Sequence, residues 1–451
     1  MTHSFYMITA LKEEISQFVQ SAGFKRYFKN TSWMLGGKLL QLIATFWVTA
    51  KVAKYLGPDQ FGLWGYAQSV GVLFIVLAGM GLKQTVSRNL VNHPDQEKKI
   101  LGTSIFLRLI GAISGLIIYS LMTVFLGDSW VVMGLIYLVI GSAFFQVFEV
   151  FDFFFQGQVK AKFGVQIQFV SVIIFALIQL ILIIIEAPLI WFGFAFFLRN
   201  IIVGVGLTWM YQVKTRNLFQ LNVDWAYGKE LIRDSWPLIF SGMVVIIYMK
   251  VDQIMLMKMV SSQAVGYYTS ALRFSEVWFF LGPVLARSLF PAIINAKKRD
   301  QKLYRSRLQN YYNLSVWLAL AISIPVALIG PWLLRQEFLF GEAFTPSGPV
   351  LVIHVWSLVF VFLGIASSEH LAVENLQIVS LYRSIAGLIV NVLLNLWLIS
   401  WIGIIGAAIA TLFSQAVASY IGYLLSRKTW HIFLMQTRAL TFYSIIKKIK
   451  S

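Results

Sequence analysis

The residues of this sequence that could do chemistry are ionisable side chains within long apolar stretches. A charge inside the hydrocarbon layer is costly and normally faces the interior of a helix bundle or a wet cavity. Groups near the ends of the stretches have the alternative of extending to the headgroups. We therefore expect a functional site among thirteen residues, which are Lys38, Arg108, Glu149, Asp152, Arg199, Lys250, Asp252, Arg273, Glu276, Arg287, His354, Glu369 and His370.

Glu149 and Asp152 form the first candidate pair. They are three residues apart and therefore share one face of a helix. Two carboxylates in a medium of low dielectric constant do not both ionise easily. The pair is thus a candidate site for a coupling ion, H⁺ or Na⁺. The alternative is that a cation at similar depth, Arg108 or Lys38, neutralises it.

A second candidate cluster combines two cations with two carboxylates. Arg273 and Glu276 are three residues apart on one apolar stretch, and Lys250 and Asp252 lie at comparable depth on the stretch before it. Lys250 and Asp252 are two apart and point in different directions. The planar fork of arginine donors matches phosphate oxygens, so the cluster could bind a diphosphate. The alternative is a salt-bridge network that holds the two helices together.

Other kinds of catalytic chemistry are poorly supplied. The chain has no cysteine and only five scattered histidines, which excludes thiolate metal sites and cysteine nucleophiles. It also lacks a complete dinucleotide-binding, phosphate-loop or nucleophile-elbow motif. We therefore expect no enzyme activity, no metal, and no cofactor other than a coupling H⁺ or Na⁺.

The apolar stretches themselves indicate the fold class. Of 451 residues, 58% are hydrophobic and only 12% charged, whereas soluble proteins carry about 25% charged residues. A water-soluble enzyme is thereby excluded. A spanning helix needs about 20 apolar residues, and backbone groups in lipid must be satisfied within it. We predict an all-α polytopic membrane protein with twelve spans, at residues 32–50, 61–82, 101–126, 130–155, 164–185, 188–211, 236–257, 264–293, 311–333, 347–372, 378–400 and 402–426.

The distribution of lysine and arginine predicts the orientation. With the amino terminus inside, the cytoplasmic segments hold 27 basic residues, Arg383 among them, and the opposite side holds four. This asymmetry obeys the positive-inside rule for twelve spans with both termini cytoplasmic. The net charge of +18 is then a topology signal with membrane lipids as partners, and nucleic acid is not required.

The chain also repeats itself once. Ser32-Trp33 and Phe61-Gly62 match Ser235-Trp236 and Val265-Gly266, which lie 203 and 204 residues later at equivalent places in the span order. Parallel duplications of this kind build transporters whose substrate lies between the halves. We predict two pseudo-symmetric six-helix bundles. The divisions are a cytoplasmic amphipathic segment (1–31), the first bundle (32–212), a cytoplasmic linker (213–235), the second bundle (236–426) and a basic cytoplasmic tail (427–451).

Four segments of the chain resemble a known family. Residues 54–62 read Lys-Tyr-Leu-Gly-Pro-Asp-Gln-Phe-Gly, a pattern of the first loop of polysaccharide-exporting flippases, and residues 251–256, 264–268 and 271–278 are similar to the same proteins. The chain thus resembles Wzx-type O-antigen and exopolysaccharide flippases of the multidrug/oligosaccharidyl-lipid/polysaccharide exporter superfamily. The resemblance extends to span count, duplication and loop placement.

The resemblance implies a function. Such proteins move undecaprenyl-diphosphate-linked oligosaccharide, an O-antigen or exopolysaccharide repeat unit, to the outer leaflet of the bacterial inner membrane by alternating access. Arg273 lies where the family often has a basic residue. Polysaccharide polymerase and chain-length machinery would be partners. We expect one group of residues, Lys38, Arg108, Lys250 and Arg273, to neutralise the diphosphate, and another, Glu149, Asp152, Asp252 and Glu276, to reset the empty cavity.

Two other functions are weighed against this one. A cation-coupled multidrug exporter of the same superfamily would favour a more acidic cavity than this sequence predicts. A membrane polysaccharide polymerase or ligase should carry a large outer loop, whereas the longest outer connection expected here is about fourteen residues, near 333–347.

Overall fold

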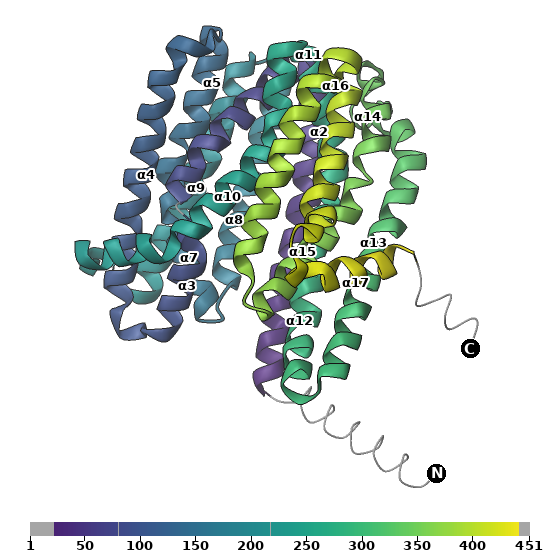
Figure 1. The fold of residues 1–451 in the computed structure, drawn as a ribbon. Coiled ribbons are helices and arrows are strands. Elements are labelled where there is room, and N and C mark those ends of the chain that lie inside the picture. Colours follow the sequence, from purple (N-terminus) through teal and green to yellow (C-terminus); the bar gives the residue numbers. More distant parts are fainter. Residues whose placement is uncertain (1–21, 80, 217, 442–451) are drawn as a thin grey trace.

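The computed structural model describes residues 22–79, 81–216 and 218–441, and every regular element within them is a helix. Long helices stand side by side, and short ones connect or flank them (Figure 1). The helices of the first half are α2 (Ala22–Gly79), α3 (Leu82–Asn92), α4 (Glu97–Leu126), α5 (Trp130–Gly141), α6 (Ala143–Gln146), α7 (Val150–Gly157), α8 (Lys162–Ile184) and α9 (Leu189–Thr215).

The second half begins with α10, which packs against both halves, and ends with a short helix that crosses the others. Short 3₁₀ turns, such as those at 147–149 and 277–280, join successive helices into one continuous helical stretch. The helices are α10 (Trp225–Met259), α11 (Ser262–Glu276), α12 (Leu281–Arg299), α13 (Gln301–Leu334), α14 (Ser347–His354), α15 (Ser357–Val373), α16 (Gln377–Ser419) and α17 (Trp430–Leu440).

The helices correspond to the predicted spans. In the described part of the chain, nine helical stretches are long and apolar enough to cross a membrane. Two of these, Gln41–Asn92 and Ile378–Ser419, each contain one predicted span and most or part of a second. The remaining predicted span, 236–257, lies within α10, which is not among the nine. The protein is therefore a polytopic all-helical membrane protein, and the predicted segments are found as helices with shifted ends.

Local sequence explains where several helices begin and where two of them break. Asp224 caps α10 by accepting a hydrogen bond from the Tyr227 amide, and Ser261 caps α11 in the same way. The broken helices contain glycines in conformations with positive φ, namely Gly57 in α2 (φ 68°) and Gly403 in α16 (φ 59°). A side chain would strain these positions, so glycine permits the chain to turn between spans.

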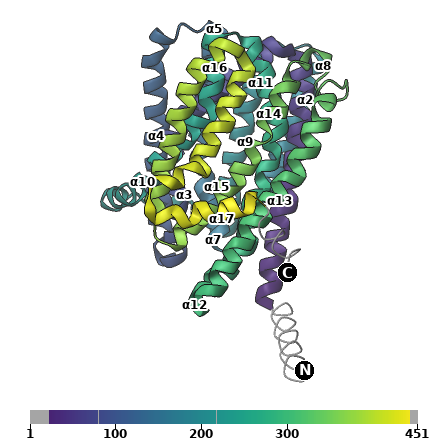
Figure 2. The same cartoon turned by 45° about the vertical axis from the view of Figure 1, so that its right-hand side comes forward.

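The boundaries of the predicted divisions differ from the helix ends. The predicted linker 213–235 is only partly a connector, because α9 continues to Thr215 and α10 starts at Trp225. The predicted tail includes α17, which runs across the long helices (Figure 2). Residues 1–21 and 442–451 lie outside the described residues, so the predictions for most of the first segment and for the end of the tail fall there.

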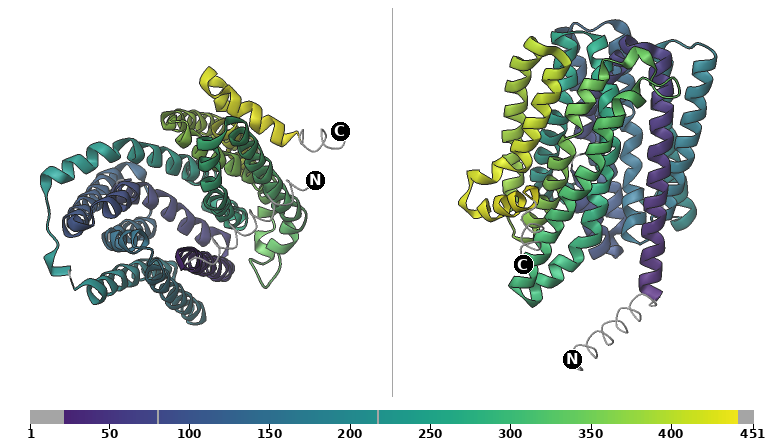
Figure 3. Two further views of the ribbon diagram at one scale, coloured as in Figure 1. Left: turned by 90° about the horizontal axis from the view of Figure 1, so that it is seen from below. Right: turned by 90° about the vertical axis from the view of Figure 1, so that its right-hand side faces the viewer.

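The buried apolar core is shared at one end of the molecule and divided at the other. One large cluster joins α2, α5, α8 and α9 with α11, α14 and part of α16. Two separate clusters serve the other end, one formed by α3, α4, α7, α9 and the start of α10 and the other by α12, α13, α15 and α17. Viewed along the helices, the two halves lie to either side (Figure 3). The halves thus share one large core at one end, whereas at the other end the start of α10 packs on the first half.

Candidate functional site

A cavity of about 740 Å³ lies between the two halves. Its walls are α2, α3, α4, α7 and α8 on one side and α10 on the other. Arg108, Glu149 and Asp152 line it together, so the structure gathers three of the predicted residues in one place. Lys83 lies on the same wall, and we call this end of the molecule the Lys83 end.

Arg108 is the cation at the centre of this wall. Its Nη2 lies 3.1 Å from Glu149 Oε2, and its Nε donates to the Ala78 carbonyl at 3.3 Å. The guanidinium also lies over the Phe153 ring, 5.7 Å from its centre. Arg108 is only 4% exposed, whereas the Glu149 side chain is 42% exposed. The structure thus pairs Arg108 with Glu149, as in the alternative interpretation of the acidic pair, and leaves the carboxylate open to the cavity.

Asp152 has different partners from Glu149 although the two share a helix face. Its Oδ2 accepts a hydrogen bond from Gln156 Nε2 at 2.8 Å, and the residue is 9% exposed. The carboxylate lies directly against Gly164 of α8, where a Cβ atom would come within 1.8 Å of Oδ1. Glycine is therefore required at 164 for α8 to approach the acid this closely.

The second predicted cluster is separate from the cavity. Arg273 Nη2 donates to Gln68 Oε1 at 2.6 Å, which links α11 of one half to α2 of the other. Gln68 is one helical turn from Val72 in the cavity wall, and Lys250 is one turn from Ile246 in the opposite wall. The cluster therefore lies about one turn beyond the inner limit of the cavity.

Three charged groups of this cluster interact without direct pairing. Lys250 interacts electrostatically with Glu276 and Arg273, and Arg273 with Glu276. Among the described residues, no ion pair joins any two of them. His354, which is 3% exposed and hydrogen-bonded to Ser275 at 2.8 Å, interacts with Lys250 and Glu276 of this cluster. The salt-bridge network that the sequence left open is not formed by direct contacts here.

Asp252 is held by uncharged partners within the second half. Its carboxylate accepts hydrogen bonds from Tyr268 at 2.7 Å, from Asn395 at 2.6 Å and from Thr411. The residue is 2% exposed. These bonds tie α10 to α11 and α16, so Asp252 has a clear structural role in addition to its predicted place among the coupling carboxylates.

One predicted residue falls outside the described side chains, and three polar residues of the site were not predicted. The side chain of Lys38 lies outside the described residues, so its predicted role stays a prediction. Sequence reasoning missed Gln68, Asn395 and Thr411. Each lies in an apolar stretch, but uncharged polar residues are common in spans, and only their distance from Arg273 or Asp252 distinguishes these three.

Arg383 corrects one part of the charge count. The positive-inside argument counted it with the cytoplasmic segments although it falls in the predicted span 378–400; the structure agrees with the span, since Arg383 lies within α16 and is 6% exposed. Its guanidinium donates to the Ala418 carbonyl at 2.9 Å and to Ser368 at 2.5 Å, and lies over the Tyr423 ring. Arg383 therefore joins neighbouring helices. The asymmetry of the remaining basic residues is hardly affected.

The opposite end, which we call the Gly62 end, is closed by reciprocal glycine contacts between α2 and α11. A Cβ atom on Gly62 would lie 1.7 Å from the Ser262 carbonyl oxygen, and one on Gly266 would lie 1.9 Å from the Pro58 carbonyl oxygen. Gly62 and Pro58 precede Gly266 and Ser262 by the same 204 residues. The contact is thus symmetric between the repeats, as in a two-fold interface.

Ion pairs across the halves reinforce this closure. Lys54 of α2 pairs with Glu337 in the loop after α13, and the Lys54 ammonium holds the pKa of the Glu337 carboxyl below its usual range. Lys258 of α10 lies 2.7 Å from Asp128 of the first half. The molecule therefore has a cavity towards the Lys83 end and close packing at the Gly62 end.

Comparisons with known proteins agree with this architecture. The profile of a family described as polysaccharide biosynthesis protein matches residues 27–297. A relative, the "Probable flippase AglR" of Haloferax volcanii, is 33% identical over 179 residues, which are 38% of this chain and 36% of that protein. The matched stretch thus spans about a third of the relative.

Two solved structures share the fold. A multidrug resistance MATE family transporter in an inward-facing conformation has a TM-score of 0.69 at 18% identity, covering 89% of this chain and 96% of that one. The lipid II flippase MurJ in an inward closed conformation has a TM-score of 0.68 at 13% identity, covering 94% and 93%. These likenesses concern the fold. Because the family profile extends through the first half and on into α12, more than half of the chain, the chain belongs to the polysaccharide biosynthesis protein family.

Proposed function

We propose that this protein is a flippase that carries an undecaprenyl-diphosphate-linked oligosaccharide across the membrane by alternating access. The main support is the cavity of about 740 Å³ between the halves, which has Arg108 and Lys83 in its wall. Tight packing closes the molecule at the opposite, Gly62 end. Such a chamber is open to a polar substrate from one side only. Family membership and the flippase name of the relative support a glycan substrate.

The substrate anion would exchange places with a carboxylate of the protein. Arg108 is buried and keeps its charge neutralised by Glu149, whose side chain is 42% exposed to the cavity. A diphosphate entering the cavity would displace Glu149 and take the guanidinium, whose fork fits two phosphate oxygens. When the substrate leaves, Glu149 would pair with Arg108 again. This gives a physical meaning to the resetting role expected for the acidic residues.

The deeper cluster would receive the diphosphate next. Lys250 and Arg273 lie about one turn further in, and the guanidinium of Arg273 donates to the neutral Gln68. Opening of the Gly62 end would separate α2 from α11 and so break the Arg273–Gln68 bond at the moment when the substrate must leave. The lipid tail would stay in the hydrocarbon beside the protein. Resetting would use H⁺ or Na⁺, and no covalent chemistry is required.

Orientation follows from the same proposal. The Lys83 end carries most of the basic residues and would face the cytoplasm of a bacterium, with both termini there and the Gly62 end outside. Polymerase and chain-length machinery would then receive the product outside. The protein would act as a transporter and not as an enzyme.

Transport in vesicles tests the proposal. Purified protein is reconstituted with a fluorescent undecaprenyl-diphosphate glycolipid, and the fraction of label exposed on the far leaflet is followed by quenching. Arg273→Ala should reduce the rate at least about tenfold, whereas the control Arg335→Ala, beyond the end of α13 at the Gly62 end, should not. Equal rates for the three proteins would contradict the assignment of Arg273.

A cation-coupled multidrug exporter is the second candidate, and the two carboxylates in the cavity wall together with the MATE-like fold favour it. The same vesicles distinguish the two functions. Efflux of a cationic dye driven by a H⁺ or Na⁺ gradient, without glycolipid movement, would support the exporter. Glycolipid movement that is insensitive to the dye would support the flippase.

A further inference from the structure

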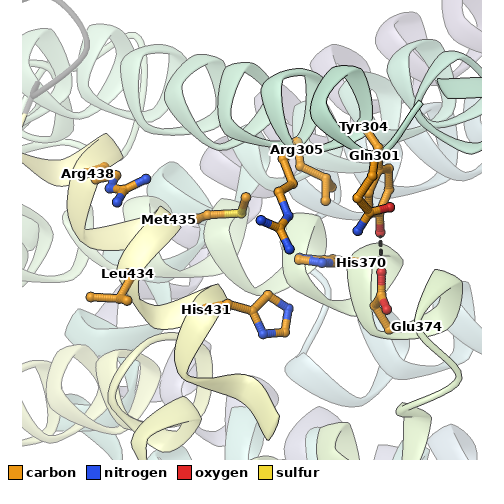
Figure 4. Close-up of a pocket in the computed structure, with 10 residues that line it drawn as sticks. Gln301, Tyr304, Arg305, His370, Glu374, His431, Leu434, Met435 and Arg438 are labelled. Atoms are coloured by element: carbon orange, nitrogen blue, oxygen red, sulfur yellow. Dashed lines mark hydrogen bonds between the residues drawn. The ribbon is translucent and has the colours of Figure 1, made fainter. Parts of the chain in front are cut away.

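A second pocket lies outside the path between the halves. It has a volume of about 350 Å³ and lies between α13, the end of α15 and α17 (Figure 4). It shares no lining residue with the inter-half cavity. Its walls are formed by Gln301, Tyr304, Arg305, Leu308, His370, Glu374, His431, Leu434, Met435 and Arg438.

The polar groups of this pocket leave an excess of positive charge. Arg305 of α13 and Arg438 of α17 both direct their guanidinium groups into the space between the helices (Figure 4). Within the described part of the chain, neither forms an ion pair. The carboxylate of the lining, Glu374, is already engaged, since Tyr304 donates to it at 2.7 Å and the Lys297 ammonium lies 3.4 Å away. The two arginines are thus available to an external anion.

The position of α17 places the pocket at a membrane surface. The helix runs across the long helices near the Lys83 end (Figures 1 and 2). It buries Ile432 and exposes Trp430 (49%) and Leu434 (53%). An exposed apolar pair beside an arginine is typical of a helix that lies in the headgroup layer, with its apolar side chains inserted and its cations near the phosphates. Arg438 extends this exposed face, one turn beyond Leu434.

We propose that this pocket binds the phosphate of an anionic phospholipid headgroup. Two arginine forks from different helices can hold a phosphate diester from two sides, and His431 lies on the same wall. The volume is within the range of sites for small molecules. Because the ligand touches both α13 and α17, its binding would fasten α17 to the second half. The group that the pocket would recognise is a phosphate ester, and a soluble phosphate ester presents the same group as a lipid headgroup.

Native mass spectrometry of the full-length protein in a neutral detergent tests this proposal. Phosphatidylglycerol, phosphatidylcholine and glycerol phosphate are titrated separately. The double variant Arg305→Gln/Arg438→Gln is compared with the matched control Arg427→Gln/Lys428→Gln, which makes the same charge change on exposed residues just before α17 and outside the pocket. We expect the pocket variant to bind phosphatidylglycerol at least about tenfold more weakly and the control to bind it within about threefold of the wild type.

The other outcomes each overturn the proposal. Equal losses in both variants would indicate general surface charge, and equal binding of phosphatidylcholine would indicate an unselective apolar contact. Glycerol phosphate binding as tightly as phosphatidylglycerol would assign the pocket to a soluble anion. If the glutamine variant is not recovered folded, Arg305→Lys/Arg438→Lys keeps the charge and removes the forks. That variant should lose part of the affinity, and an unchanged affinity would again contradict the assignment.

Discussion

Replacing Gly62 by alanine should shift the protein towards a conformation that is open at the Gly62 end. The added Cβ would lie 1.7 Å from the Ser262 carbonyl oxygen, whereas an ordinary contact starts at 3.4 Å, so α2 and α11 must separate by about 1.7 Å. The obstacle is backbone, which cannot rotate away. Overpacking of this kind costs about 1–3 kcal/mol, and the cost is paid only while the end is closed. The higher helix propensity of alanine acts in both conformations and cancels.

The expected population shift is therefore about 5- to 150-fold towards the open form. The chain contains no cysteine, so spin labels can be placed on single cysteines without background. Labels at Trp130 and Ala343, exposed positions of the two halves at the Gly62 end, report their separation by pulsed electron paramagnetic resonance. The distance distribution should lengthen in Gly62→Ala and in its counterpart Gly266→Ala.

Gly36→Ala is the matched control, because Gly36 also lies in α2 but a Cβ there meets nothing within 4 Å. It should leave the distribution unchanged. The reasoning would be refuted by a folded Gly62→Ala protein with the wild-type distance distribution, or by equal lengthening in Gly36→Ala.

Three further predictions concern carboxylates. Glu149→Gln should bind the glycolipid more tightly and release it more slowly, because the diphosphate no longer competes with the Glu149 carboxylate for Arg108. Weaker binding in a titration would contradict the proposed exchange of anions on Arg108. The double variant with Asp152→Asn should lose the response of transport to a H⁺ or Na⁺ gradient, and a retained response would remove both from coupling. The Lys99 ammonium, 2.6 Å from Asp224, holds the pKa of that carboxyl below its usual range. Its stabilising contribution is therefore present above pH of about 4 and is lost as the pH falls through the lower folded value, so thermal unfolding in detergent should show Asp224→Asn less stable than wild type at neutral pH and equally stable in strong acid.

The register of the internal repeat was the most informative local signal. Two short matches, 203 and 204 residues apart, indicated the repeat, and the second paired Gly62 with Gly266. The structure shows why small residues occur at both places, since each glycine faces the backbone of the other repeat. Sequence periodicity identified the equivalent positions but contained no information that they touch. Contact depends on how the two halves pack, and no local pattern encodes that packing.

The charged residues show the same division. The sequence identified Arg108 and Glu149 as candidates but left two roles open, and their distance of 3.1 Å decides for pairing in this conformation. The charge count assigned Arg383 to the cytoplasmic side although the predicted span 378–400 includes it, whereas carbonyl and hydroxyl acceptors from neighbouring helices make its buried position tolerable. Such acceptors become visible only when the neighbouring helices are known.

The sequence alone was enough to establish that this is a helical membrane protein of two related halves. The evidence was the length of the apolar stretches, the uneven distribution of basic residues and the internal duplication, which can all be read without a folded structure. Tertiary structure alone decided which end of the junction is packed shut, which ionisable groups face the cavity and which are satisfied within one half. The physical reason is that a charge inside a membrane must find partners, and the available partners are contributed by helices far apart in the sequence.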